Sequence, residues 1–219
     1  MENAIEIAVG GSAANPPHLG HLSVLRALLE SRRFAKVIWI PSGSRADKKE
    51  MIDANHRIAM TNRLIQALEE ILSPEIISTL DVRDDDARGE NTPTIDWIRR
   101  LEQEFPDAKI IWYTGADSVV PQDRFDGKCE IEARWRDGKT LMEKYAFLII
   151  PRESYPDPKT LNLPSQFEVM PYIDIQDISG SEIRRLIAQN DPRFETLVPQ
   201  LVADYIKENH LYGWQGDKK

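Results

Sequence analysis

The chain has 219 residues, of which 41% are hydrophobic and 29% are charged, a composition typical of a soluble globular domain. Acidic residues number 36 against 28 Lys and Arg, so the formal net charge is −8. This charge excludes a protein whose main task is to coat nucleic acid or an anionic membrane. The longest apolar runs fall far short of the ~20 residues of a membrane-spanning helix, and we expect no signal peptide. Together with a single cysteine, Cys129, these features predict a cytoplasmic protein and leave a homo-oligomer open.

Short β-branched runs alternate along the chain with longer stretches whose apolar residues recur at helical spacing. In chain order, the predicted elements are a strand over Ile5–Val9, a helix over Leu19–Arg33, a strand over Lys36–Ile40, a helix over Ala54–Leu72, a strand over Ile76–Val82, a helix over Thr94–Phe105, and strands over Ile110–Tyr113 and Tyr145–Ile150. This alternation is typical of a mostly parallel sheet with helices on both faces. The sequence therefore predicts an α/β, Rossmann-like fold.

We expect residues 1–213 to form a single domain, because no repeat, low-complexity tract or linker rich in Pro, Gly and Ser divides the chain. The stretch 121–139 is polar and is predicted to be an insert or loop over the sheet. Residues 214–219 are predicted to be a loose tail.

The most informative stretch joins the first predicted strand to the first predicted helix and reads Gly10-Gly11-Ser12-Ala13-Ala14-Asn15-Pro16-Pro17-His18-Leu19-Gly20-His21. In open parallel sheets, ligands bind beyond the carboxyl ends of the strands. Glycines there let the backbone approach a ligand, and the helix N-terminus offers unpaired N–H groups to a phosphate. The two histidines are placed to donate to an anionic oxygen. The glycine spacing does not fit the dinucleotide fingerprint, and no Cys or acidic ligand lies at a zinc-site spacing.

A second stretch, Ile178–Arg185, predicts the start of a helix that Ser179 or Ser181 caps. Arg184 has the planar guanidinium that suits phosphate, although this stretch alone fits an ordinary capped surface helix better than a binding site. The acidic run at Asp84–Asp86 is interpreted as an exposed loop rather than a metal site.

Taken together, the two stretches resemble the nucleotidyltransferase superfamily with a His-x-Gly-His type motif. Within it, the chain most resembles the nicotinate/nicotinamide mononucleotide adenylyltransferase family. Further similar pieces are Lys48-Lys49 with the helix around His56-Arg57, then Thr92-Pro93-Thr94-Ile95-Asp96, Gly115-Ala116-Asp117-Ser118, and the C-terminal stretch Leu197–Tyr212. The resemblance runs from about residue 5 to 213. The chain differs from the family pattern at Ala13-Ala14, where an aromatic residue is usual, and the stretch is one residue longer than the pattern.

The resemblance implies a fold of the nucleotidyltransferase type. It also implies transfer of AMP from ATP to nicotinate or nicotinamide mononucleotide, which forms deamido-NAD or NAD and releases pyrophosphate. Mg²⁺ is expected to be bound mainly through the ATP phosphates. The residues that carry over are His18, His21 and Arg184 for catalysis; Gly10, Gly11, Ser12, Gly115, Asp117, Arg152, Ser179 and Ser181 for ATP; and Asn15, Lys48, Lys49, Thr94 and Trp97 for the mononucleotide.

Other functions remain open from the sequence. A sister transferase could act on phosphopantetheine or use CTP, and the altered Ala13-Ala14 turn leaves room for a nucleotide-binding regulator with weak catalysis. In each case the cationic groups are predicted to converge on one cleft at the carboxyl edge of the sheet. These groups are Lys48, Lys49, Arg152 and Arg184, together with His18 and His21.

Overall fold

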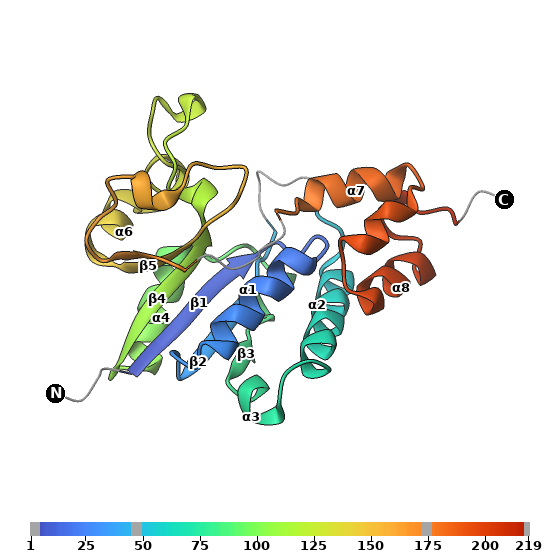
Figure 1. Cartoon of the computed structure of the whole chain (residues 1–219), viewed down its shortest axis with the longest axis horizontal. Helices are drawn as coiled ribbons and strands as arrows, with labels where there is room; N and C mark the ends of the chain where they lie inside the picture. The colour runs from blue at the N-terminus through green and yellow to red at the C-terminus, as the bar shows by residue number, and fades with distance from the viewer. Residues whose placement is uncertain (1–4, 45–49, 172–176, 217–219) are drawn as a thin grey trace.

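The computed structural model describes residues 5–44, 50–171 and 177–216. Within these residues, six parallel strands form one sheet in the order β3-β2-β1-β4-β5-β6 (Figure 1). The strands are β1 (Ile5–Ser12), β2 (Lys36–Pro41), β3 (Leu80–Val82), β4 (Ala108–Gly115), β5 (Ala146–Ile150) and β6 (Phe167–Val169). The strand order reverses between β1 and β4, which is the position where open α/β sheets bind ligands. The predicted fold class is confirmed.

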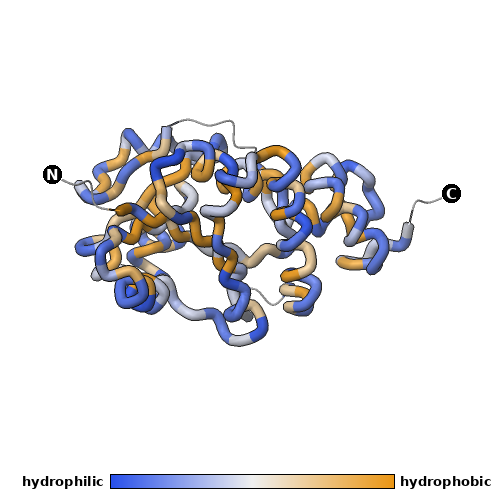
Figure 2. Tube along the Cα trace, turned by 90° about the horizontal axis from the view of Figure 1, so that it is seen from below, coloured by the Kyte–Doolittle hydropathy of each residue, from blue (hydrophilic) through white to orange (hydrophobic). Residues whose placement is uncertain are grey.

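Helices cover both faces of the sheet. They are α1 (Leu19–Glu30), α2 (Ala54–Glu69), α3 (Pro74–Ile77), α4 (Thr94–Glu104), α5 (Glu130–Arg134), α6 (Gly138–Lys144), α7 (Gly180–Ala188) and α8 (Gln200–Glu208). In Figure 1, α8 lies beside α2, and α7 lies above them. Orange and blue segments alternate along the helices in Figure 2, as expected for helices with one buried face. Among the described residues, no helix has both the length and the apolar character needed to cross a membrane.

The strands of the sheet contribute side chains to a hydrophobic core on each face. Successive residues of β1 point to opposite faces, so Ala8 belongs to the core that residues of α1, α2, α7 and α8 complete, whereas Val9 belongs to the core that residues of α4, α5 and α6 complete. The first core includes Leu25 and Ile183, and the second includes Ile95. This arrangement leaves the carboxyl ends of the strands free to carry polar loops.

Three expectations about the elements were wrong in part. The predicted strand over Ile76–Val82 is shorter, because Pro74 starts the helical turn α3 and only Leu80–Val82 pairs with β2. Strand β6 was not predicted. The stretch 121–139 is more than a polar loop, because it contains α5 and the fully buried Ile131 of the second core.

The prediction that the loose tail begins at residue 214 does not hold for Trp214. Trp214 is only 4% exposed, and its ring contacts Phe194 edge to face, with the ring centroids 5.2 Å apart. The packed chain therefore includes Trp214, while residues 217–219 lie outside the described part of the structure.

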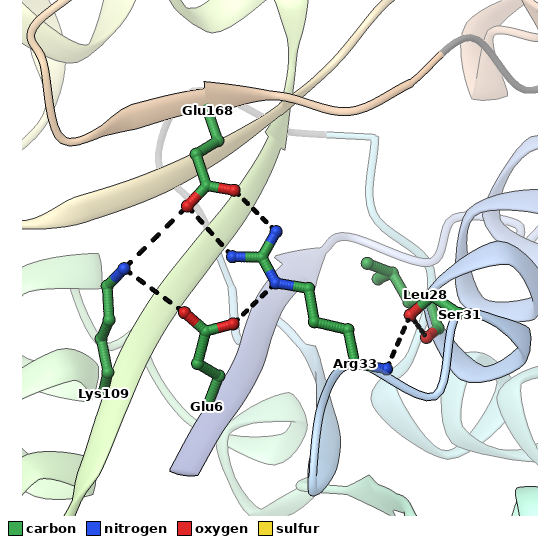
Figure 3. Close-up of polar contacts among 6 residues, drawn as sticks. All are labelled: Glu6, Leu28, Ser31, Arg33, Lys109 and Glu168. Atoms are coloured by element: carbon green, nitrogen blue, oxygen red, sulfur yellow. Dashed lines mark hydrogen bonds and ion pairs between the residues drawn. The ribbon is translucent and has the colours of Figure 1, made fainter. Parts of the chain in front are cut away.

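A charged network joins β1, β4 and β6 where these strands begin, at the edge opposite the loops that follow β1 and β4 (Figure 3). Arg33 Nε donates to Glu6 Oε2 at 2.6 Å, and its terminal nitrogens bind both oxygens of Glu168 at 2.6 and 3.0 Å. Lys109 Nζ lies 3.4 Å from Glu6. The hydrogen bonds from Arg33 are the main reason that the pKa values of Glu6 and Glu168 are lowered.

Replacing Arg33 with methionine is expected to lower the free energy of unfolding by about 1 kcal/mol at neutral pH, since the network is partly exposed. Because the folded-state pKa of both glutamates is depressed, this contribution is present above their ordinary pKa of 4.5 and is lost as the pH falls through the folded values. Urea titrations from pH 7 to pH 3 measure it. The control is Arg26→Met on the exposed face of α1. A difference between wild type and Arg33→Met that does not shrink in acid would contradict this account.

Candidate functional site

The loop between β1 and α1 is shaped by short local contacts. Ser12 Oγ accepts a hydrogen bond from the Ala14 N–H at 3.2 Å, and Ala14 has a left-handed backbone with φ of 47°. Both Ala13 and Ala14 are buried. The departure from the family pattern therefore produces an ordered turn, which leads to His18 at the N-cap of α1.

The two glycines of this loop differ in what they do. A Cβ atom on Gly10 would lie 2.3 Å from the Tyr113 ring, whereas one on Gly11 would meet the Ile40 carbonyl oxygen at 3.1 Å. Gly10 is buried and Gly11 is exposed. Close approach of the backbone to a nucleotide was the expected reason for a glycine at position 10. The structure gives a different reason, because Gly10 makes room for the Tyr113 ring. Gly11 lies at the open edge.

His18 and His21 form a contacting pair at the start of α1. Their ring centroids are 3.8 Å apart, and the backbone N–H of His18 donates to His21 Nδ1 at 3.2 Å. An Nδ1 that accepts this bond places the proton of a neutral His21 on Nε2, which can then donate to a ligand.

His18 is the more deeply buried member of the pair, with 9% of its surface exposed. Burial, followed by the neighbouring His21 and Arg152, lowers its pKa well below the ordinary value of 6.5. His18 is therefore neutral at pH 7, which corrects its expected place among the cationic groups. Its buried Nδ1 has no hydrogen-bond partner within the described part of the chain, and such an atom is typical of a functional site.

Arg184 brings the second motif against the first. Ser179 caps α7 by accepting from the Glu182 N–H at 3.5 Å. One terminal nitrogen of Arg184 donates to the Asn15 carbonyl oxygen at 2.8 Å, and the other lies 3.2 Å from both Ser181 Oγ and Glu50 Oε2. Two motifs that are 169 residues apart in the sequence thus meet at one edge.

Arg152 lies between two carboxylates next to the histidine pair. It donates to Asp117 at 3.2 Å and to Asp177 at 2.6 and 3.0 Å. Although burial raises the pKa of Asp177, hydrogen bonds from Ser154 and Arg152 outweigh it and hold the pKa below its usual range. Only glycine fits at position 115 in this arrangement, because a Cβ atom there would lie 2.3 Å from Asp117 Oδ1. Asp177 was not predicted, although it directly precedes the second motif.

The residues expected to bind the mononucleotide differ in their exposure and in their contacts. The Asn15 amide is used inside the protein: its Nδ2 donates to the Glu50 carbonyl oxygen at 3.0 Å. Thr94 begins α4 and is partly exposed. Lys48 and Lys49 lie outside the described residues.

Trp97 is only 7% exposed and belongs to the second core, where its indole N–H donates to Asp86 at 2.9 Å. A buried ring offers no face for stacking, so this structure contradicts a stacking role for Trp97. Asp86 also accepts from the Thr92 N–H at 3.1 Å and from its hydroxyl at 2.9 Å. The acidic run is thus more than an exposed loop, because Asp86 fixes the turn that leads into α4.

Arg57 of α2 lies at the same edge, and the sequence did not predict a role for it. Its guanidinium is buried and donates to the backbone carbonyl oxygens of Ala13, Ser42, Ile52 and Ala87 at 2.8–3.3 Å. These carbonyl groups belong to the loops that follow β1 and β2, to the segment before α2, and to the 3₁₀ turn η1 (Asp85–Arg88). Arg57 therefore ties together the loops at the carboxyl edge of the sheet.

The donors at this edge are imidazole, guanidinium, hydroxyl and backbone N–H groups, which suit phosphate oxygens. Among the residues that the structure describes, no three His, Cys, Asp or Glu side chains lie close enough together to hold a metal ion. A histidine pair at the first crossover helix, joined by an arginine from a later helix N-terminus, together with the reversal of strand order, defines a nucleotidyltransferase-type α/β protein.

Comparison with known proteins agrees with this class. The cytidylyltransferase-like family model matches residues 9–186, and the chain belongs to this family. It is 29% identical over 207 residues to a probable nicotinate-nucleotide adenylyltransferase of Leifsonia xyli subsp. xyli (strain CTCB07), covering 94% of this chain and 93% of the relative. A similarly named protein of Methylacidiphilum infernorum (isolate V4) is 28% identical over 216 residues, covering 95% of this chain and 93% of that protein.

Among solved structures, the chain is similar to Plasmodium falciparum nicotinic acid mononucleotide adenylyltransferase complexed with NaAD. The TM-score is 0.80 at 23% sequence identity, and the match covers 96% of this chain and 98% of the other. At this identity the likeness establishes the fold. The family resemblance stated from the motifs is confirmed.

Proposed function

We propose that the protein transfers the AMP group of ATP to nicotinate mononucleotide, forming deamido-NAD and releasing pyrophosphate. The observation that carries the proposal is the 2.8 Å contact between Arg184 and the Asn15 carbonyl oxygen, which brings the two nucleotidyltransferase motifs to one edge beside His18 and His21. The names of the relatives favour nicotinate over nicotinamide as the pyridine group, a choice that the sequence alone leaves open.

The reaction needs positioning and charge stabilisation rather than a protein nucleophile. A phosphate oxygen of the mononucleotide attacks the α-phosphorus of ATP in line. The new P–O bond forms as the bond from the α-phosphorus to the oxygen bridging the β-phosphorus breaks, and pyrophosphate leaves with that electron pair.

The residues take separate roles in this proposal. His21 donates from Nε2, and His18 donates as a neutral imidazole, to phosphate oxygens whose charge grows in the transition state. Ser179, Ser181 and Arg184 hold the β- and γ-phosphates at the N-terminus of α7, where helix N–H groups favour anions. Roles at the ATP and mononucleotide sites are proposed for Gly11, Ser12, Gly115, Asp117, Arg152, Thr94, Lys48 and Lys49.

Mg²⁺ fits this site as a companion of the nucleotide. The described donor set suits phosphate oxygens, and the Asp117 carboxylate is already engaged by Arg152, so the metal would be held mainly by the triphosphate. When bound, Mg²⁺ supplies positive charge that offsets the charge of the phosphates.

The test is a product assay with ATP and Mg²⁺ and, in separate reactions, nicotinate mononucleotide, nicotinamide mononucleotide or phosphopantetheine; a further reaction replaces ATP by CTP. We expect deamido-NAD as the main product, and chelation of Mg²⁺ should abolish its formation. If neither pyridine substrate gives a dinucleotide, the proposal is wrong. Product from phosphopantetheine or CTP would instead identify a sister transferase, and ATP binding without turnover would identify a regulator.

A cytoplasmic location is part of the same proposal. It rests on the single cysteine, Cys129, which is buried and free, and on the nucleotide substrates. Fractionation of the source cells tests it, and size-exclusion chromatography with light scattering gives the oligomeric state.

A further inference from the structure

The 3₁₀ turn η6 (Leu211–Gly213), near the end of the described chain, lies against the loop that carries the first motif. The Tyr212 hydroxyl donates to Asn15 Oδ1 at 2.9 Å, a contact between residues 197 positions apart. Nothing in the proposed chemistry requires Tyr212 to touch a substrate. Its contact with the first motif therefore needs a separate explanation.

The backbone around Tyr212 is held in an uncommon conformation. Tyr212 has φ of 54° and His210 has φ of 49°, both in the left-handed region that non-glycine residues usually avoid. The flanking side chains of Leu211 and Trp214 are buried in the first core. Packing on both sides thus fixes Tyr212 in place, and strain of this kind is characteristic of functional positions.

The Asn15 amide that accepts from this hydroxyl bonds three partners, Glu50, Ile52 and Tyr212, and we call this cluster the junction. Its Nδ2 donates to the Glu50 carbonyl oxygen at 3.0 Å, and its Oδ1 accepts from the Ile52 N–H at 3.4 Å as well as from Tyr212. A rotated amide would present the wrong group to each of these partners. The Tyr212 hydroxyl therefore selects a single orientation of the Asn15 side chain.

Burial keeps the Tyr212 hydroxyl a hydrogen-bond donor. Burial raises the pKa of its hydroxyl well above the usual value, against the opposing effect of Arg184 and Arg57. The hydroxyl stays protonated at any physiological pH. Because Arg184 also binds the Asn15 backbone carbonyl, the junction joins η6, the first motif, the segment before α2 and α7.

We infer that Tyr212 is a positioning residue for adenylyl transfer, which acts by holding Asn15 and, through it, both the loop that presents His18 and the segment at Glu50–Ile52. This inference rests on the proposed function. The family resemblance also places Asn15 at the mononucleotide, so release of its amide is expected to disturb the mononucleotide side of the site as well as the histidine side. The ribose and adenine of ATP are expected near Asp117 and Arg152, and the hydrogen bonds of Arg152 described above go to Asp117 and Asp177.

The decisive variant is Tyr212→Phe, which removes one hydroxyl and keeps the ring. We expect kcat to fall about ten-fold and KM for the mononucleotide to rise about three-fold, because a small displacement of positioned groups is costly, while KM for ATP changes less than two-fold. The matched control is Tyr205→Phe, whose hydroxyl bonds His56 Nδ1 at 3.0 Å between α8 and α2. It should lose a similar bond and retain wild-type kinetics.

A double-mutant cycle with Asn15→Leu tests whether the hydroxyl acts through Asn15. We expect Tyr212→Phe to add less than a two-fold further loss of kcat in the Asn15→Leu background. Wild-type kcat in Tyr212→Phe, the same loss of kcat in Tyr205→Phe, or full additivity in the cycle would each overturn the inference.

Hydrogen exchange separates failure of this inference from failure of the proposed function. Without substrates, the amides of residues 13–18 and 50–53 should exchange faster in Tyr212→Phe than in Tyr205→Phe. If the wild-type protein makes no dinucleotide, the proposed function is wrong and this comparison alone decides the positioning role. Equal exchange rates in the two variants would then overturn it.

Discussion

Replacing His21 with alanine is expected to reduce kcat at least ~100-fold while the protein remains folded, as is typical when a transition-state donor is lost. The His18 backbone N–H donates to His21 Nδ1 at 3.2 Å, which places the proton of a neutral His21 ring on Nε2. Steady-state kinetics together with circular dichroism measure both halves of this prediction.

A second substitution separates the catalytic effect from helix capping. Glutamate at the third helical position can also accept from the N-cap N–H, so His21→Glu should keep α1 stable and yet be at least as inactive as His21→Ala. Activity within ten-fold of wild type in either folded variant would remove His21 from the mechanism.

Replacing Arg57 with methionine is expected to lower the free energy of unfolding by about 3 kcal/mol, because buried carbonyl groups lose their donor. Arg57 is only 2% exposed, and burial lowers its pKa, so its charge is kept in the fold by the carbonyl oxygens around it. Chemical denaturation measures the loss. Lysine cannot match the planar, multiple-donor guanidinium, so Arg57→Lys should recover less than half of it.

The matched control is Arg63→Met on the same helix. Arg63 lies over the Tyr205 ring at 4.0 Å and donates to the Ala59 carbonyl oxygen, within α2. Its loss should cost less than ~1 kcal/mol. Equal destabilisation by the two substitutions would show that Arg57 has no special part in joining the loops.

The elements that could be predicted from the sequence are those with a strong local pattern. The run at Ile5–Val9 and the apolar stripe that begins at Leu19 gave β1 and α1, whereas β6 has only three residues and no measurable period. Ile76 and Ile77 resemble a strand, but Pro74 starts a helical turn there.

In the site, too, the residues that could be predicted are those whose partners lie nearby in the sequence. His18 and His21 lie one helical turn apart, so their spacing alone predicts a pair. Apart from the Ile52 carbonyl, which lies 5 positions from Arg57, the partners of Arg57, Asp177 and Tyr212 described above lie 15–44, 23–25 and 197 positions away, respectively. No local pattern encodes such contacts. Gly10 was misinterpreted for the same reason, since the ring it accommodates belongs to β4.

The bond between Tyr212 and Asn15 has a consequence for biosynthesis. Translation runs from the N-terminus, and domains fold as their segments emerge from the ribosome. The strands of the sheet have all been synthesised by residue 169, but the junction at Asn15 waits for residue 212. The first loop to be made is thus among the last parts of the molecule to be completed, so a nascent chain can acquire its sheet before it acquires a finished active site.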